Sequence, residues 1–159
     1  MRAPAWLLVL LSLASAGCGP TIDLTKGVQV LNLSTGWFDA GVVAGNNKLV
    51  PSVTFELKNI SGRSLGTLQV NALFRRVAEH DEWGSGFITV AGAEGLASGA
   101  TSPAVTINSQ LGYTGTEPRL DMFQNSQFVD AKVELFAKYG STQWTRLGEY
   151  AIARQLIER

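Results

Sequence analysis

The chain has 159 residues, 45% of them hydrophobic and 16% charged, so it is long and apolar enough to fold as one globular domain without disulfides. Thirteen basic residues balance thirteen acidic ones, which excludes the strongly basic surface by which proteins bind nucleic acid. One cysteine and one histidine are too few for the usual zinc sites and catalytic triads. We therefore expect neither catalytic residues nor a cofactor or metal ion.

The first 17 residues have the features of a secretory signal peptide. Arg2 supplies a positive charge, the run "WLLVLLSL" from Trp6 to Leu13 is apolar, and small residues follow it. The apolar run is shorter than the roughly 20 residues of a membrane-spanning helix. Removing residues 1–17 leaves 12 basic and 13 acidic residues, because Arg2 is the one charge lost.

Two processing sites are compatible with "ASAGCGP", residues 14–20. Cleavage after Ala16 follows the small-x-small pattern and leaves Cys18 as a free thiol. Alternatively, "SAGC" resembles a bacterial lipobox, with Ser15 where such boxes usually have Leu, Val or Ile. That resemblance implies that Cys18 becomes the N-terminus and carries diacylglycerol. Gly19 replaces the aspartate that often retains such proteins in the inner membrane, so the resemblance favours the outer membrane, facing the periplasm.

The mature chain is expected to divide into a short tether and one domain. Residues 18–27 form the tether, which would span at most about 30 Å when fully extended. Residues 28–159 form the domain. If Cys18 is lipidated, the domain therefore stays close to the membrane surface.

Seven segments of the domain have the character of β-strands. Alternation is clearest in "SVTFELKN", "TLQVNALFRRV" and "VDAKVELFAKY", in which every second residue is apolar. Residues 39–51 are expected to be a Gly- and Asn-rich loop with a turn at "GNN" and at most a short edge piece at "GVV". The predicted strands are residues 28–33, 52–59, 67–77, 87–90, 104–109, 129–139 and 144–152.

Short connections without a βαβ rhythm predict an all-β fold, an immunoglobulin-like antiparallel β-sandwich of about seven strands. Residues 78–86 are a charged connection between two strands. Residues 110–127 lose the periodicity, and within them "TEPRLDMFQN" predicts one or two helical turns that begin near Pro118.

Residues 51–109 resemble the FxLYD-type and related immunoglobulin-like domains of bacterial secreted proteins. The resemblance rests on "VTFELKNISGRSLGTLQVNALF" and the later "GLASGATSPAVTI". Phe74 keeps the aromatic residue of the family pattern, and Arg75 stands in place of its acidic residue. The resemblance implies a β-sandwich that generally has no known enzymatic role.

Four aromatic residues are candidate contacts for a ligand or partner. Trp37 closes a strand, Trp83 lies among charges, and Tyr113 lies in the long irregular connection. Phe136 is on the outward face of an otherwise charged strand. The run "EHDE", Glu79 to Glu82, is interpreted as a solvated hairpin rather than a metal site, because neighbours on an extended chain point to opposite sides.

Two functions follow from these observations. The first is a non-catalytic lipoprotein of a bacterial cell envelope, anchored through Cys18, whose domain contacts another envelope protein. The second is a module that binds a glycan or another small ligand through Trp83, Trp37 and Tyr113, because aromatic rings in the loops of β-sandwiches can stack on ligands.

Overall fold

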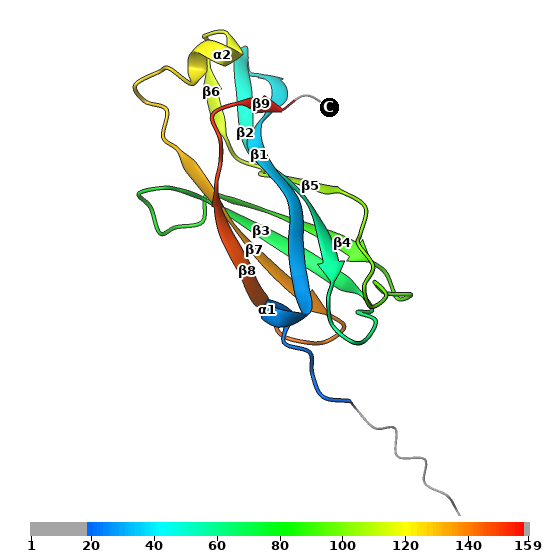
Figure 1. The fold of residues 1–159 in the computed structure, drawn as a ribbon. Helices are drawn as coiled ribbons and strands as arrows, with labels where there is room; N and C mark the ends of the chain where they lie inside the picture. The colour runs from blue at the N-terminus through cyan, green and yellow to red at the C-terminus, as the bar shows by residue number, and fades with distance from the viewer. Residues whose placement is uncertain (1–18, 158–159) are drawn as a thin grey trace, which may run out of the picture.

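The computed structural model describes residues 19–157, which form nine strands and two short helices (Figure 1). The predicted signal peptide and Cys18 lie outside these residues. No helix within them is long and apolar enough to cross a membrane. The elements are α1 (Leu24–Gly27), β1 (Val28–Val43), β2 (Asn46–Asn59), β3 (Leu68–Arg76), β4 (Gly84–Ala91), β5 (Val105–Asn108), β6 (Tyr113–Gly115), α2 (Arg119–Met122), β7 (Ala131–Tyr139), β8 (Thr145–Ala151) and β9 (Leu156–Ile157).

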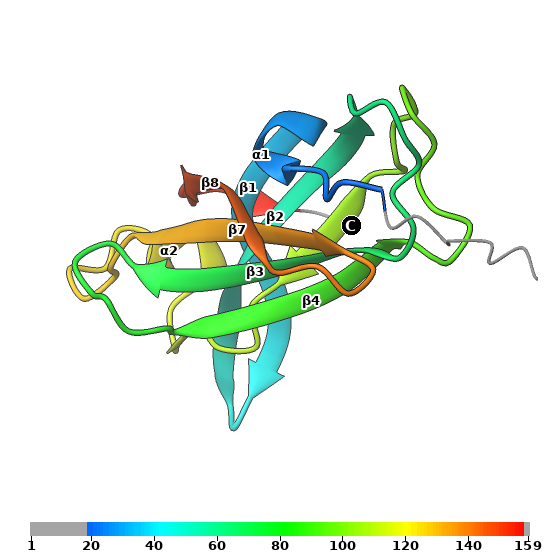
Figure 2. The same cartoon turned by 90° about the horizontal axis from the view of Figure 1, so that it is seen from below.

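The strands form two sheets that pack face to face. One sheet has the order β5-β2-β1-β9, with β6 also pairing with β2, and the other has the order β4-β3-β7-β8. Figure 2 shows β1 and β2 crossing the four-stranded sheet at a steep angle. Strand β9 runs parallel to β1, and the remaining pairs in the described part of the chain are antiparallel.

This arrangement confirms the predicted all-β, immunoglobulin-like antiparallel sandwich. Strands β1, β2 and β5 lie side by side in one sheet, whereas β3, β7 and β8 lie side by side in the other, as in the two sheets of an immunoglobulin-like domain. The seven predicted strands correspond to β1–β5, β7 and β8. The two further strands, β6 and β9, are only three and two residues long.

The core contains the apolar residues that alternation predicts. In β3, in β7 and in β2 from Val53 onward, every second side chain is buried between the sheets, and its neighbours are less buried. Burying an aromatic or branched aliphatic side chain of this kind contributes about 1.5–3 kcal/mol, so these three strands supply most of the apolar burial. The fully buried members are Val53, Phe55, Leu57, Leu68, Val70, Ala72, Phe74, Val133, Leu135 and Ala137.

The loop predicted at residues 39–51 is wrong, because β1 and β2 continue through it as a long hairpin. The hairpin turns at Ala44 and Gly45, whose φ angles of 50° and 80° are those of a two-residue turn with both residues in the left-handed region. Gly41, with φ 86°, lies at a register shift between Asp39 and Val42. The glycines therefore mark a bulge and a turn within a hairpin.

The charged connection ends earlier than predicted, because β4 begins at Gly84. A Cβ atom on Gly84 would collide with the Ser109 hydroxyl, and one on Gly86 would collide with the Ile107 side chain. The two glycines thus let β4 approach β5 of the other sheet closely. The predicted helical turn near Pro118 is confirmed, since α2 begins directly after it.

Candidate functional site

Five aromatic rings converge at the end of the sandwich that carries β6 and α2. They come from β1 (Trp37), from the residue before β4 (Trp83), from β6 (Tyr113) and from the segment after α2 (Phe123 and Phe128). The Trp37 ring centre lies 6.1 Å from that of Trp83, 5.8 Å from that of Tyr113 and 4.7 Å from that of Phe128. We call these five residues the aromatic cluster. Three of the four predicted contact residues thus meet in one place.

Two arginines cover the rim of the aromatic cluster. The guanidinium carbon of Arg76 lies 4.9 Å from the centre of the Trp83 ring, and that of Arg154 lies 5.0 Å from the centre of the Phe128 ring. Arg154 also pairs with Asp130 at 2.6 Å, and this hydrogen bond raises the pKa of the guanidinium. The arginines were not singled out from the sequence, because only the tertiary fold brings them to these rings.

Trp37 lies at the centre of the aromatic cluster and is 0% exposed. Its predicted role as a contact for an external ligand is therefore wrong. The ring is covered by residues that follow in the chain, including Tyr113 and Phe128, and sequence alternation in β1 does not reveal that cover. Its indole N–H has no hydrogen-bond acceptor within the described residues. Trp37 thus acts as a core residue.

A small cleft lies beside the cluster, between β6, α2 and the following segment. It is lined by Tyr113, Glu117, Met122, Asn125 and Phe128 together with three neighbouring residues, and its volume is about 70 Å³. Ligand pockets of proteins usually have volumes of about 300–1,000 Å³, so the cleft is too small to enclose a sugar ring. The Tyr113 hydroxyl accepts a hydrogen bond from the Val129 amide at 2.8 Å, which fixes the ring in the fold.

Phe136 does not join the aromatic cluster. It lies on the outer face of β7, in register with Asn71 of β3 and Arg146 of β8, and it is half-buried. The outward orientation predicted from alternation is confirmed.

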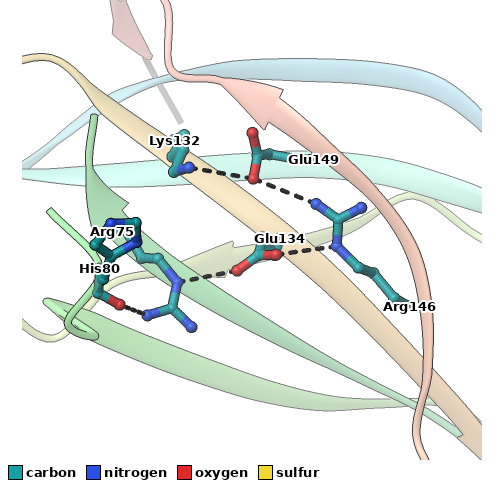
Figure 3. Close-up of polar contacts among 6 residues, drawn as sticks. All are labelled: Arg75, His80, Lys132, Glu134, Arg146 and Glu149. Carbon is teal, nitrogen blue, oxygen red and sulfur yellow. Dashed lines mark hydrogen bonds and ion pairs between the residues drawn. The ribbon is translucent and has the colours of Figure 1, made fainter. Parts of the chain in front are cut away.

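Ion pairs connect β3, β7 and β8 on the same outer face as Phe136 (Figure 3). Glu134 accepts from Arg75 Nε and from Arg146 Nε, both at 2.9 Å. Arg146 and Lys132 also contact Glu149, at 3.2 and 3.3 Å. The hydrogen bond from Arg75, and then that from Arg146, hold the pKa of the Glu134 carboxyl below its usual range. This network is positioned by the strand register rather than by any loop.

The run Glu79 to Glu82 is exposed in the turn between β3 and β4. The His80 backbone carbonyl accepts a hydrogen bond from Arg75 (Figure 3), and Glu79 pairs with Arg76 at 3.1 Å. Within residues 19–157, no three His, Cys, Asp or Glu side chains are grouped so that they could hold a metal ion.

The N-terminal segment after Cys18 is docked on the sandwich. Leu24 is buried at 1% exposure, and the Ile22 amide donates to the Tyr139 hydroxyl at 2.7 Å. Arg63 donates to the Pro20 carbonyl, and the Ile60 amide donates to that of Gly27 at 3.0 Å. The predicted tether of residues 18–27 is therefore shorter than the sequence indicates, because Leu24 completes the core.

The opposite end of the molecule exposes apolar side chains. Val42, at the tip of the β1–β2 hairpin, is 62% exposed, and Leu120 in α2 is 63% exposed. An ion pair between Asp39 and Arg119 joins the hairpin to α2. Figure 1 shows this end, with α2 and the hairpin, far from α1 and the docked N-terminal segment. We call it the distal end.

Comparison with known proteins does not assign the chain to a family. No protein-family model matches the chain, and no curated protein sequence is significantly similar to it. Among solved structures, the chain is similar to the "X-ray structure of Northeast Structural Genomics Consortium target SoR45", with 12% identity, 82% of this chain and 89% of that chain covered, and a TM-score of 0.46.

The resemblance to FxLYD-type domains stays a prediction, because nothing in these comparisons bears on it. A functional interpretation therefore rests on the geometry of the three regions described above: the aromatic cluster, the docked N-terminal segment and the distal end.

Proposed function

We propose that this protein is a non-catalytic lipoprotein of a bacterial cell envelope, which holds its sandwich against the periplasmic face of the outer membrane and contacts another envelope protein through its distal end. The docked N-terminal segment is the observation that carries the proposal. An anchor on Cys18 would be followed by only three residues before Ile22, whose amide is bonded to Tyr139.

The short link gives the proposed anchor a consequence for orientation. Four residue steps separate Cys18 from Ile22, and they span at most about 14 Å. The end of the sandwich with α1 and the β7–β8 turn would therefore lie next to the lipid headgroups. The distal end would point away from the membrane and into the periplasm.

The distal end has the composition of a protein contact. Val42 and Leu120 are each more than half exposed, and the Asp39–Arg119 pair holds their two elements together. Exposed apolar residues rimmed by charges are typical of protein-binding surfaces. Glycan binding by the aromatic cluster is less favoured, because Trp37 is buried and Trp83 packs against Trp37 and Tyr113.

The mass of the protein extracted from membranes tests the anchor. We expect an N-terminal Cys18 that carries acyl chains, and we expect Cys18→Ser to move the protein to the soluble periplasmic fraction. An unmodified chain that begins at Gly17 would overturn the anchor and would leave the contact at the distal end to be tested separately.

Photocrosslinking in living cells tests the contact. A photoreactive residue at position 42 or 120 is expected to give one discrete crosslinked protein species. The matched control is position 97, where Ala97 is exposed in the loop between β4 and β5. A crosslink of equal yield at position 97, or none at either distal position, would contradict the proposal.

A further inference from the structure

The outer face of the four-stranded sheet carries two exposed aromatic rings. Phe87 in β4 is 57% exposed and Trp144, just before β8, is 40% exposed. Their ring centres are 6.2 Å apart at an interplanar angle of 81°. Strands β3 and β7 lie between β4 and β8, and neighbouring strands are about 4.8 Å apart. The two side chains therefore lean toward each other across the face. Each ring remains partly exposed to solvent.

Two amide side chains lie on the same face, in strand β3. Asn71 of β3 is in register with Phe87 on one side and Phe136 on the other, and Gln69 is in register with Lys138. Neither amide side chain makes a hydrogen bond within residues 19–157. Each can accept and donate hydrogen bonds to a bound molecule.

Lys138 is the cation on this face that no carboxylate neutralises. Its Nζ lies 5.0 Å from the centre of the Trp144 ring, and within the described residues it has no ion pair. The other outward cations, Arg75, Lys132 and Arg146, all contact Glu134 or Glu149. Four cations against two carboxylates give this face a charge of +2 on a chain whose formal net charge is 0.

We propose that this face binds an acidic polysaccharide built of uronic acid units. The C–H face of a pyranose ring packs on the rings of Phe87 and Trp144, its hydroxyl groups bond the amides of Gln69 and Asn71, and its carboxylate pairs with Lys138. The half-buried Phe136 contributes to the apolar floor. The site is an open face rather than a pocket, so it suits a polymer that lies across the strands.

The composition of the face favours this ligand over an apolar protein surface. An apolar partner would cover Lys138 and two amides without giving them partners, and buried polar groups without hydrogen bonds are costly. A neutral glycan has no negatively charged group that could pair with the excess positive charge of this face. The inference is independent of the anchor, since none of these residues lies in the N-terminal segment.

Affinity electrophoresis tests the inference with protein expressed from its full sequence. The probes are polygalacturonate, which is acidic, and dextran, which is neutral. We expect polygalacturonate to retard the protein and to change its tryptophan fluorescence, whereas dextran does neither. We expect Lys138→Gln to weaken polygalacturonate binding about tenfold, the effect of one lost charge contact of about 1.4 kcal/mol, and Trp144→Ala or Phe87→Ala to abolish it.

The matched control is Lys26→Gln, which removes the same charge from exposed α1. It is expected to bind polygalacturonate like the wild type. If Lys26→Gln and Lys138→Gln weakened polygalacturonate binding equally, the binding would be a nonspecific attraction between charges, and the proposal would be overturned. The same holds if the wild type is not retarded, or if the Trp144→Ala variant binds normally while its circular dichroism shows a native fold.

Discussion

Arg76 lies between an aromatic ring and a carboxylate. Its guanidinium carbon is 4.9 Å from the centre of the Trp83 ring, and its Nη1 is 3.1 Å from Oε1 of Glu79. A cation over an indole face stabilises the fold by about 0.5–1 kcal/mol at an exposed site. Trp37 and Tyr113 also pack against this ring, with ring centres 6.1 and 5.3 Å away, so Trp83 is held within the aromatic cluster.

We therefore expect Arg76→Ala to uncover the Trp83 ring. Acrylamide quenching of tryptophan fluorescence should increase, and the free energy of unfolding should fall by about 1 kcal/mol. The matched control is Arg154→Ala, which uncovers Phe128 instead and should leave the quenching unchanged. Quenching that is the same in wild type and Arg76→Ala would show that another group covers Trp83.

The lowered pKa of Glu134 predicts how the free energy of unfolding changes at acidic pH. The hydrogen bonds from Arg75 and then Arg146 lower the pKa of this carboxyl in the folded protein below its ordinary value of 4.5. The folded state therefore binds fewer protons than the unfolded state, so this stabilisation is complete above about pH 4.5 and is lost as the pH falls through the lowered value. Acid should weaken the junction of β3, β7 and β8.

Glu134→Gln tests this response by urea unfolding between pH 7 and pH 3. At pH 7 the variant should be less stable by about 1 kcal/mol, because it loses two ion pairs that are partly exposed. Below pH 4.5 its free energy of unfolding should fall less steeply than that of the wild type. Arg75→Gln, which removes the larger cause of the shift, should give an intermediate slope. Parallel curves for Glu134→Gln and the wild type would refute the assignment.

The sequence predicted the strands whose two faces differ. Val53, Phe55 and Leu57 alternate with polar residues because one face of β2 packs against the other sheet and the opposite face is in contact with solvent. The same reasoning identified Phe136 as outward, and applied to "FITV" it places Phe87 outward as well, since Phe87 and Thr89 alternate with Ile88 and Val90.

The sequence failed where burial depends on segments far away in the chain. Trp37 is sealed by Tyr113 and Phe128, which no local pattern relates to it. The hairpin of β1 and β2 extends beyond the sandwich, so its tip has exposed valines and no alternation to detect. Leu24 looked like part of a tether because a single buried leucine has no periodic partners.

Gly86 should be intolerant of any side chain. A Cβ atom there would collide with Cγ2 of Ile107 and lie 3.1 Å from the Asn108 carbonyl oxygen of β5. Relief of that collision requires the two sheets to separate at this edge, so we expect Gly86→Ala to lower the free energy of unfolding by about 1–3 kcal/mol. Chemical denaturation measures this change.

Gly62→Ala is the control for this prediction. A Cβ atom on Gly62 would have no heavy atom within 4 Å, and we expect a change within about 0.5 kcal/mol. Equal effects at the two positions would mean that glycine flexibility, and not the close approach of β4 to β5, determines the cost at Gly86.

Ala44 offers a way to strengthen the distal hairpin. Its φ of 50° is unfavourable for alanine, and Gly45 after it has φ 80°. Asparagine tolerates this conformation, and Asn-Gly is the preferred pair in turns of this kind. Ala44→Asn should therefore stabilise the turn by about 0.5–1 kcal/mol, whereas Gly45→Ala should destabilise it by about 1 kcal/mol.

Amide hydrogen exchange is the measurement suited to this turn, because a hairpin tip that extends beyond the core can open without global unfolding. The amides of Val43 and Asn46, which pair across the turn, should exchange more slowly in Ala44→Asn and faster in Gly45→Ala. Amides of the core strand β7 should be unaffected. If β7 changed in parallel with the tip, the hairpin would open only when the whole sandwich unfolds, and the distal end would be as rigid as the core.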